Sequence, residues 1–157
     1  MRRTVVAACL GLLAAGCYSF TGGQVPFRTV AIPSAANATA EYRLPELVTK
    51  AMFEAVERDG RMKLSEPKAA QGRYEIEITG YQHQPYVYDR QEAVRQYRVT
   101  ITAKAALRAG SGKAVWEGAS VSGWAVYAPD SLDEPAGMQR AAANLAEEIT
   151  RQSLETW

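Results

Sequence analysis

Residue types that could carry catalysis are sparse in this sequence. His83 is the only histidine, and no acidic or nucleophilic motif stands beside it. A histidine needs a reacting or orienting partner to act as a general base, so we expect His83 to be exposed and chemically idle. Glu75 and Glu77 would share one face of a strand, where a solvated surface is the simpler explanation. No Gly-X-Ser-X-Gly turn occurs. We therefore expect no enzyme, no bound metal and no cofactor.

A row of basic side chains is the best candidate for binding chemistry. Arg98, Lys104 and Arg108 fall on the polar face of one predicted strand, and Arg90 and Arg95 precede them. Such a row could pair with the phosphates of an anionic lipid or with the carboxylates of a partner. A strand face that is simply solvated would have the same pattern, so both explanations stay open.

Tyrosines gather in the same region of the chain. Tyrosine is common at interfaces because it combines apolar area with a hydroxyl group, but a buried tyrosine also belongs in a core. We expect the group to divide between these roles. Its members are Tyr74, Tyr81, Tyr86, Tyr88 and Tyr97.

Cys17 is the candidate for covalent modification. A basic start is followed by an uncharged, mostly apolar stretch over residues 4–15, which is too short to span a bilayer. The small residues before Cys17 resemble the cleavage and lipidation signal of bacterial lipoproteins, although Ala14 stands where leucine is more common. We expect a signal peptide over 1–16, a lipid anchor on Cys17 and a tether over 17–26. An ordinary cleaved signal with a chance cysteine is the alternative.

The cysteine count favours lipidation. Cys9 lies inside the predicted signal and would be removed with it, which leaves Cys17 alone. A single unmodified cysteine is unusual in an exported protein.

The whole chain has a formal net charge of +1, which gives no indication of nucleic-acid binding.

One long strand organises the elements that must position these residues. From Tyr97 to Leu107, apolar and polar residues alternate with a period of two, which is typical of a strand with one covered and one solvated face. A glycine-rich turn over 109–113 joins it to a further strand over 115–127. Gly118 and Gly123 indicate a bulge or bend in that strand.

Two amphipathic helices are predicted to cover the sheet. The first begins at Leu44-Pro45 and ends at Asp59-Gly60, where glycine supplies a left-handed cap. Phe53 lies outside its apolar stripe and is expected to point outward. The second helix carries a stripe from Met138 to Ile149 whose alanines permit close approach to the sheet.

The order of elements predicts one domain over 27–157. Shorter strands are expected over 27–32, 62–64 and 74–79, and residues 82–92 are expected to form a polar connection. This order is typical of an α+β two-layer sandwich, with two helices packed on one face of a mostly antiparallel sheet of four to five strands.

Several short motifs carry a resemblance to one family. They are Gly16-Cys17-Tyr18-Ser19-Phe20, Thr29-Val30-Ala31-Ile32-Pro33, the segment Leu44–Leu64, Tyr97-Arg98-Val99-Thr100-Ile101-Thr102 and Gly112-Lys113-Ala114-Val115-Trp116-Glu117. In these motifs the chain resembles the LptE family of outer-membrane lipopolysaccharide-assembly lipoproteins.

The resemblance implies a function and partners. The chain would be a plug-like lipoprotein, anchored through Cys17 on the periplasmic side of the outer membrane and seated in the lumen of an LptD-like β-barrel. It would assist assembly of that barrel and delivery of lipopolysaccharide to the outer leaflet. Family members contact lipopolysaccharide through basic residues, and strand geometry makes Arg98, Lys104 and Arg108 the candidates in this chain.

Alternatives remain at this point. The segment Val30–Leu64 also resembles the opening of two other classes of lipoprotein, the curli-secretion type and the penicillin-binding-protein-activator type. The first would make the chain a secretion-pore subunit, and the second an activator of a periplasmic enzyme. A periplasmic lipid-binding module without a barrel partner is a third possibility, and it would require an apolar pocket.

Overall fold

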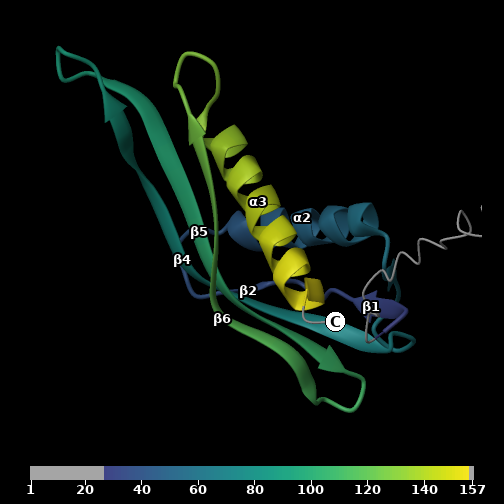
Figure 1. Ribbon diagram of the computed structural model, residues 1–157. Coiled ribbons are helices and arrows are strands. Elements are labelled where there is room, and N and C mark those ends of the chain that lie inside the picture. Colours follow the sequence, from purple (N-terminus) through teal and green to yellow (C-terminus); the bar gives the residue numbers. More distant parts are fainter. Residues whose placement is uncertain (1–26, 156–157) are drawn as a thin grey trace, which may run out of the picture.

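Two helices lie on one face of an open, curved sheet in the computed structural model, which describes residues 27–155 (Figure 1). The predicted signal peptide, Cys17 and the rest of the predicted tether lie outside those residues. Within the described residues, no helix lies on the opposite face of the sheet. The three longest strands extend past the helices, and the hairpin between two of them projects furthest (Figure 1). The α+β two-layer prediction is confirmed.

Helix α2 spans Leu44–Asp59, as its end signals predict. Pro45 lies in the first turn, and Gly60 adopts φ 74° while its N–H donates to the carbonyl of Val56 at 3.1 Å. A left-handed conformation at this position is why glycine ends the helix. Phe53 points outward with 38% of its surface exposed.

Helix α3 spans Glu134–Glu155 and lies very close to the sheet. Its buried stripe includes the predicted apolar residues, from Met138 to Ile149. At Gly123 the approach is so close that a Cβ atom would lie 2.2 Å from the backbone nitrogen of Leu145. Gly123 therefore makes room for the helix, and the pairing with β5 shows no register shift at this position.

The sheet has six strands in the described part of the chain. They are β1 (Thr29–Ala31), β2 (Ala36–Asn37), β3 (Lys63–Leu64), β4 (Gly72–Tyr88), β5 (Val94–Ala109) and β6 (Ala114–Tyr127). The order is β3-β1-β4-β5-β6, with β2 paired to β4. The long strands β4, β5 and β6 pair antiparallel, whereas the short strands pair parallel. The sequence did not predict β2.

Strand β5 is the predicted organising strand, and its alternation is confirmed. Val99, Ile101, Ala103 and Leu107 are each 0% exposed beneath the helices. The polar residues between them face the uncovered side, which we call the open face. Gly112 has φ 87° in the predicted turn to β6, and β6 contains a bulge near Gly118, opposite the segment 103–105 of β5.

The predicted connection over 82–92 is wrong for most of its length, because β4 continues to Tyr88. Register shifts near Thr79 and Tyr86 break the alternation that would reveal a strand. Pro85 is tolerated because β4 has no described partner on that side beyond Ile78, and an edge strand can accept a residue without an N–H donor.

The core lies between the helices and the inner face of the sheet. Tyr74 is 1% exposed there, and its hydroxyl shares a hydrogen bond of 2.7 Å with Ser153 of α3. At the free edge of the sheet, the N–H of Trp124 in β6 donates to the side-chain oxygen of Asn144 at 3.0 Å. These two contacts tie α3 to β4 in the middle of the sheet and to β6 at its edge.

Candidate functional site

The predicted basic row lies on the open face of β5, as its alternation requires. Lys104 and Arg108 are both paired with glutamates of neighbouring strands. Lys104 Nζ lies 3.7 Å from Glu77, while Arg108 Nε lies 2.5 Å from Glu75 and Arg108 Nη2 lies 3.2 Å from Glu117. We call the open face around these ion pairs the charged half. Arg73 belongs to it as well, 2.5 Å from Glu75.

Electrostatics hold the charged half together at neutral pH. The hydrogen bond from Arg108, supported by a second from Arg73, keeps the pKa of the Glu75 carboxyl below its ordinary value. The same pairing with Glu75 raises the pKa of Arg108. These groups therefore remain ionised and mutually paired. Beside them lies a hollow of about 680 Å³ whose floor includes small residues such as Ala106 and Gly118.

Arg98 has different surroundings from the other two basic residues. Its guanidinium carbon lies 4.7 Å from the centre of the Trp124 ring and 5.7 Å from that of Tyr86. Its Nε atom is buried and has no hydrogen-bond partner. Six positions separate Arg98 from Lys104, which corresponds to roughly 20 Å along a strand. The three predicted residues share one face but do not form one site.

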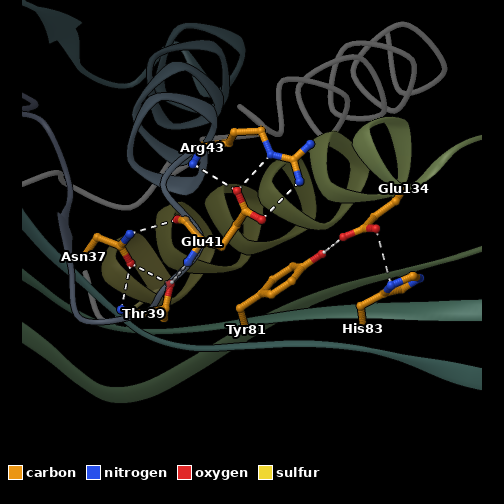
Figure 2. Close-up of polar contacts among 7 residues, drawn as sticks. All are labelled: Asn37, Thr39, Glu41, Arg43, Tyr81, His83 and Glu134. Atoms are coloured by element: carbon orange, nitrogen blue, oxygen red, sulfur yellow. Dashed lines mark hydrogen bonds and ion pairs between the residues drawn. The ribbon is translucent and has the colours of Figure 1, made fainter.

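A polar cluster on the covered side was not predicted (Figure 2). Tyr81 and His83 both point from β4 toward Glu134 in the first turn of α3 (Figure 2). The Tyr81 hydroxyl donates to Glu134 Oε1 at 2.7 Å, and His83 Nδ1 lies 3.5 Å from Glu134 Oε2. His83 Nε2 shares a hydrogen bond of 2.8 Å with the Tyr127 hydroxyl.

The expectation that His83 has no partners is therefore corrected, although the residue as a whole is exposed, as expected. Its side chain is 26% exposed, and its ring lies 5.0 Å from that of Tyr97 and 5.9 Å from that of Tyr127. The sequence could not indicate these partners, since Tyr127 and Glu134 follow His83 by 44 and 51 positions and belong to other elements. The bulge near Thr79 turns Tyr81 and His83 toward the helices.

The loop before α2 borders the same cluster. Glu41 pairs with Arg43 at 2.8 Å, and both lie beside Tyr81 (Figure 2). The Asn37 side chain supports this loop by donating to the carbonyl of Glu41 at 2.9 Å. Burial, together with the hydrogen bond to Glu134, raises the pKa of Tyr81. Tyr81 is therefore a protonated donor at neutral pH.

The chemistry of this cluster is structural. A carboxylate, an imidazole and phenols could in principle move protons, but no serine or cysteine nucleophile is bonded to them in the contacts described. Within residues 27–155, no group of three or more metal-ligating side chains occurs. Each member instead joins the sheet to the first turn of α3.

Within residues 27–155, no helix is long and apolar enough to cross a membrane.

The predicted tyrosine group divides as expected. Tyr74 is buried, Tyr81 and Tyr97 pack against the core, and Tyr86 and Tyr88 are 51% and 57% exposed. The two exposed rings lie near the projecting end of β4. The sequence identified Tyr86 as one of the tyrosines that could lie at an interface. Its contact with Arg98 could not be predicted, because that contact depends on the register between strands.

Comparison with known proteins places the chain among lipoproteins. The model of the LptE family, described as lipopolysaccharide-assembly, matches residues 27–153. No curated protein is similar enough in sequence to count as a match.

Solved structures share the fold at low identity. A lipoprotein from Caulobacter crescentus is 18% identical with a TM-score of 0.52, covering 82% of this chain and 88% of its own. The PelC dodecamer from Paraburkholderia phytofirmans is 15% identical with a TM-score of 0.52, covering 82% and 94%. Rare lipoprotein B from Shewanella oneidensis is 12% identical with a TM-score of 0.50, covering 82% and 95%.

Proposed function

Because this chain belongs to the LptE family of lipopolysaccharide-assembly proteins, we propose that it is the lipoprotein partner of an LptD-like β-barrel in the outer membrane. It plugs the lumen of that barrel, assists barrel assembly and helps to deliver lipopolysaccharide to the outer leaflet. Its role is binding and assembly, without catalysis. A lipid on Cys17 anchors it on the periplasmic side.

The open face of the sheet is the observation that carries this proposal. Both helices pack on the other face, so the outward residues of three long strands are free to meet a partner (Figure 1). The inner surface of a large barrel is polar, and a plug must present a polar surface to it. The ion-paired part of the open face meets that requirement.

The charge balance of the charged half favours contact with such a wall. Its three glutamates neutralise its three basic residues through the ion pairs described above. Moving a lone charge out of water is costly, whereas a paired and hydrogen-bonded charge costs less. We therefore assign Lys104 and Arg108 to partner contact. Arg98, which has no such pairing, is the candidate for contact with lipopolysaccharide.

The decisive test is affinity purification of the tagged, full-length protein from detergent-solubilised outer membranes, followed by mass spectrometry. We expect a large β-barrel to be recovered in stoichiometric amount. Recovery of the protein alone, in a homo-oligomeric ring, or with a penicillin-binding protein would overturn the proposal in favour of one of the alternative classes.

The anchor is tested separately by fractionation. Cys17→Ala is expected to move the protein from the membrane pellet to the soluble fraction, because the lipid provides the membrane affinity. Cys9→Ala is the matched control, since that cysteine belongs to the predicted signal and its loss should change nothing. Unchanged membrane association of Cys17→Ala would contradict the anchor.

A further inference from the structure

Basic side chains gather at the end of the sheet that lies opposite the projecting hairpin (Figure 1). Strand β1 begins here, beside β3, the start of β4 and the turn between β5 and β6. Four exposed cations lie in these segments, and we call them the basic end. They are Arg28, Lys63, Lys68 and Lys113.

Hydrogen bonds hold the segments of the basic end together. The N–H of Lys63 donates to the carbonyl of Arg28 at 2.9 Å. The N–H of Arg28 donates to Gln71 Oε1 at 2.9 Å, and the carbonyl of Gln71 accepts from the N–H of Gly110 at 2.8 Å. Lys113 follows Gly110 in the turn between β5 and β6. The four cations therefore belong to one surface of fixed elements.

A hollow lies within this surface. Its volume is about 380 Å³, and its lining includes Lys68, Arg73 and the backbone of the turn over 109–112. Arg73 is already paired with Glu75, so Lys68 supplies the uncompensated charge at the rim. A group of phosphate size could enter this hollow, which makes the basic end an anion-binding surface with relief.

The protein does not neutralise the basic end itself. Within residues 27–155, none of its four cations forms an ion pair. Among the segments 27–31, 63–73 and 109–114, the one carboxylate is Glu66. The nearest acids outside those segments, Glu75 and Glu117, are engaged by arginines. Four unpaired cations against one unpaired carboxylate leave an excess of three positive charges.

The opposite end of the sheet is balanced by comparison. In the hairpin between β4 and β5, Asp89 pairs with Arg95 at 2.9 Å. Arg90 and Glu92 lie in the same turn and offset each other in charge. The excess of positive charge is therefore confined to one end of a chain whose formal net charge is only +1.

The basic end is also where the chain leads toward the predicted lipid. Phe27 is the first described residue, and its ring packs over Gly72, where a Cβ atom would collide with it. Ten residues over 17–26 separate Phe27 from the predicted start of the mature chain. Even fully extended, ten residues span at most about 35 Å. A lipid on Cys17 would therefore keep the basic end close to the membrane.

We propose that the basic end binds the anionic phospholipid headgroups of the membrane that holds the Cys17 anchor. The proposal rests on the proposed anchor and adds orientation to it. The lipid fixes one point of the chain, and the basic end turns this end of the sheet toward the headgroups. The open face and the projecting hairpin then stay free for the proposed barrel partner.

The physical basis is electrostatic attraction to a charged surface. Lysine and arginine donate charge-assisted hydrogen bonds to phosphate oxygens. An anionic membrane attracts basic residues within about one Debye length of its surface. Because the four cations have no internal carboxylate partner, no ion pair has to break before they meet the headgroups.

The test measures how close the basic end lies to a membrane. The full-length lipidated protein is reconstituted in vesicles of phosphatidylcholine alone and in vesicles that also contain phosphatidylglycerol. A fluorophore on Ser111→Cys reports proximity to a quencher on the lipid headgroups. Since the proposed signal removes Cys9 and the proposed lipid occupies the sulfur of Cys17, the introduced cysteine is the only free thiol of the mature chain.

We expect phosphatidylglycerol to increase quenching of the Ser111 label severalfold. A label on Gln91→Cys in the projecting hairpin, roughly 50 Å away along β5, should show no increase. Raising the salt concentration from about 0.1 M to about 1 M shortens the Debye length to about 3 Å, and this should abolish the effect. Equal quenching of the Ser111 label in the two kinds of vesicle would overturn the proposal.

Two matched double variants assign the effect to the basic end. Lys68→Gln with Lys113→Gln removes two of its cations, each worth about fivefold in attraction to an anionic surface. The ratio of quenched to unquenched label should therefore fall by about 25-fold. Arg90→Gln with Arg140→Gln removes two exposed, unpaired charges elsewhere and should leave the quenching unchanged. Equal losses would show an effect of net charge alone, and the basic end would be wrong.

Glycerol phosphate distinguishes a membrane surface from a small dissolved anion. At matched ionic strength it should leave the quenching unchanged, because one dissolved headgroup lacks the summed charge of a surface. If it releases the label as completely as high salt does, the hollow beside Lys68 is a small-anion site and the membrane proposal fails.

The vesicles contain no barrel, so the outcome is separate from the proposed function. If a barrel is recovered in affinity purification but phosphatidylglycerol has no effect, the basic end fails and the barrel-partner role stands. If the expected variant pattern appears but no barrel is recovered, the basic end stands and the barrel-partner role fails. Circular dichroism of each variant confirms that the fold is retained.

Discussion

The Tyr81 hydroxyl donates to Glu134 Oε1 at 2.7 Å and thereby ties β4 to the first turn of α3. Tyr81→Phe removes this bond and leaves Glu134 with its weaker 3.5 Å contact to His83. We expect the free energy of unfolding to fall by about 1 kcal/mol, the usual net value of one hydrogen bond. Urea denaturation measures it.

A matched variant separates this bond from general packing. Tyr86→Phe removes a hydroxyl from an exposed ring and should leave the midpoint within experimental error. Equal losses in the two variants would show that the bond to Glu134 contributes nothing to stability.

Tyr74 predicts how stability responds to alkali. Burial raises the pKa of Tyr74 to about 12. Because the folded-state pKa is raised, the folded state holds the Tyr74 proton more tightly than the unfolded state does. The stability that results is fully present below the unfolded pKa of about 10 and is lost as the pH rises from there to about 12. The loss from this group is about 3 kcal/mol. Chemical denaturation at several pH values in this window should show the decline.

The variant Tyr74→Phe should flatten that decline. It costs about 1 kcal/mol at neutral pH through the lost bond to Ser153. The decline will not vanish, since burial also raises the pKa of Tyr81 and of Tyr127. Tyr88→Phe removes an exposed phenol and should leave the alkaline slope unchanged. A slope that Tyr74→Phe does not alter would contradict the assignment.

Gly123→Ala tests the close approach of α3. The added Cβ would lie 2.2 Å from the nitrogen of Leu145, and backbone cannot move aside as a side chain can. We expect a loss of about 2 kcal/mol or more in the free energy of unfolding. In Gly80→Ala the new Cβ would lie 3.5 Å from Thr102, an ordinary contact, so that variant should change stability by less than about 0.5 kcal/mol. Equal effects would refute the close approach.

The proposed barrel contact predicts a rescue by charge exchange. Lys104→Glu places a second carboxylate beside Glu77 and leaves net negative charge on the charged half. Recovery of the barrel in affinity purification should fall by about fivefold, equivalent to roughly 1 kcal/mol. Adding Glu77→Lys to that variant reverses the pair and should restore recovery, because neutrality matters more than which strand bears the positive charge. Failure of the double variant to restore recovery would argue against this contact.

Local signals were enough to predict the elements that end abruptly or alternate cleanly. Helix α2 follows its proline start and Gly60 cap, and β5 follows its period of two. The continuation of β4 could not be predicted because two bulges shift its register and hide the alternation. The position of a bulge depends on the pairing with the partner strand, and no local sequence pattern around Thr79 or Tyr86 indicates one.

The candidate site shows the same limit. The residue types placed Arg98, Lys104 and Arg108 on one face, but their different surroundings depend on neighbours from other strands. Glutamates reach Lys104 and Arg108 across the sheet, whereas Arg98 meets aromatic rings. The sequence shows which positions carry a charge. Whether an opposite charge pairs with it depends on the register between strands, which the sequence does not show.

The bond from the Trp124 N–H to Asn144 has a consequence for the behaviour of many copies together. Strand β6 lies at the end of the sheet order and has fourteen residues, a length at which an uncovered edge can template the addition of a further strand. Asn144 occupies one of the donors that such an incoming strand would need. A single helical asparagine therefore works against edge-to-edge association of copies through β6.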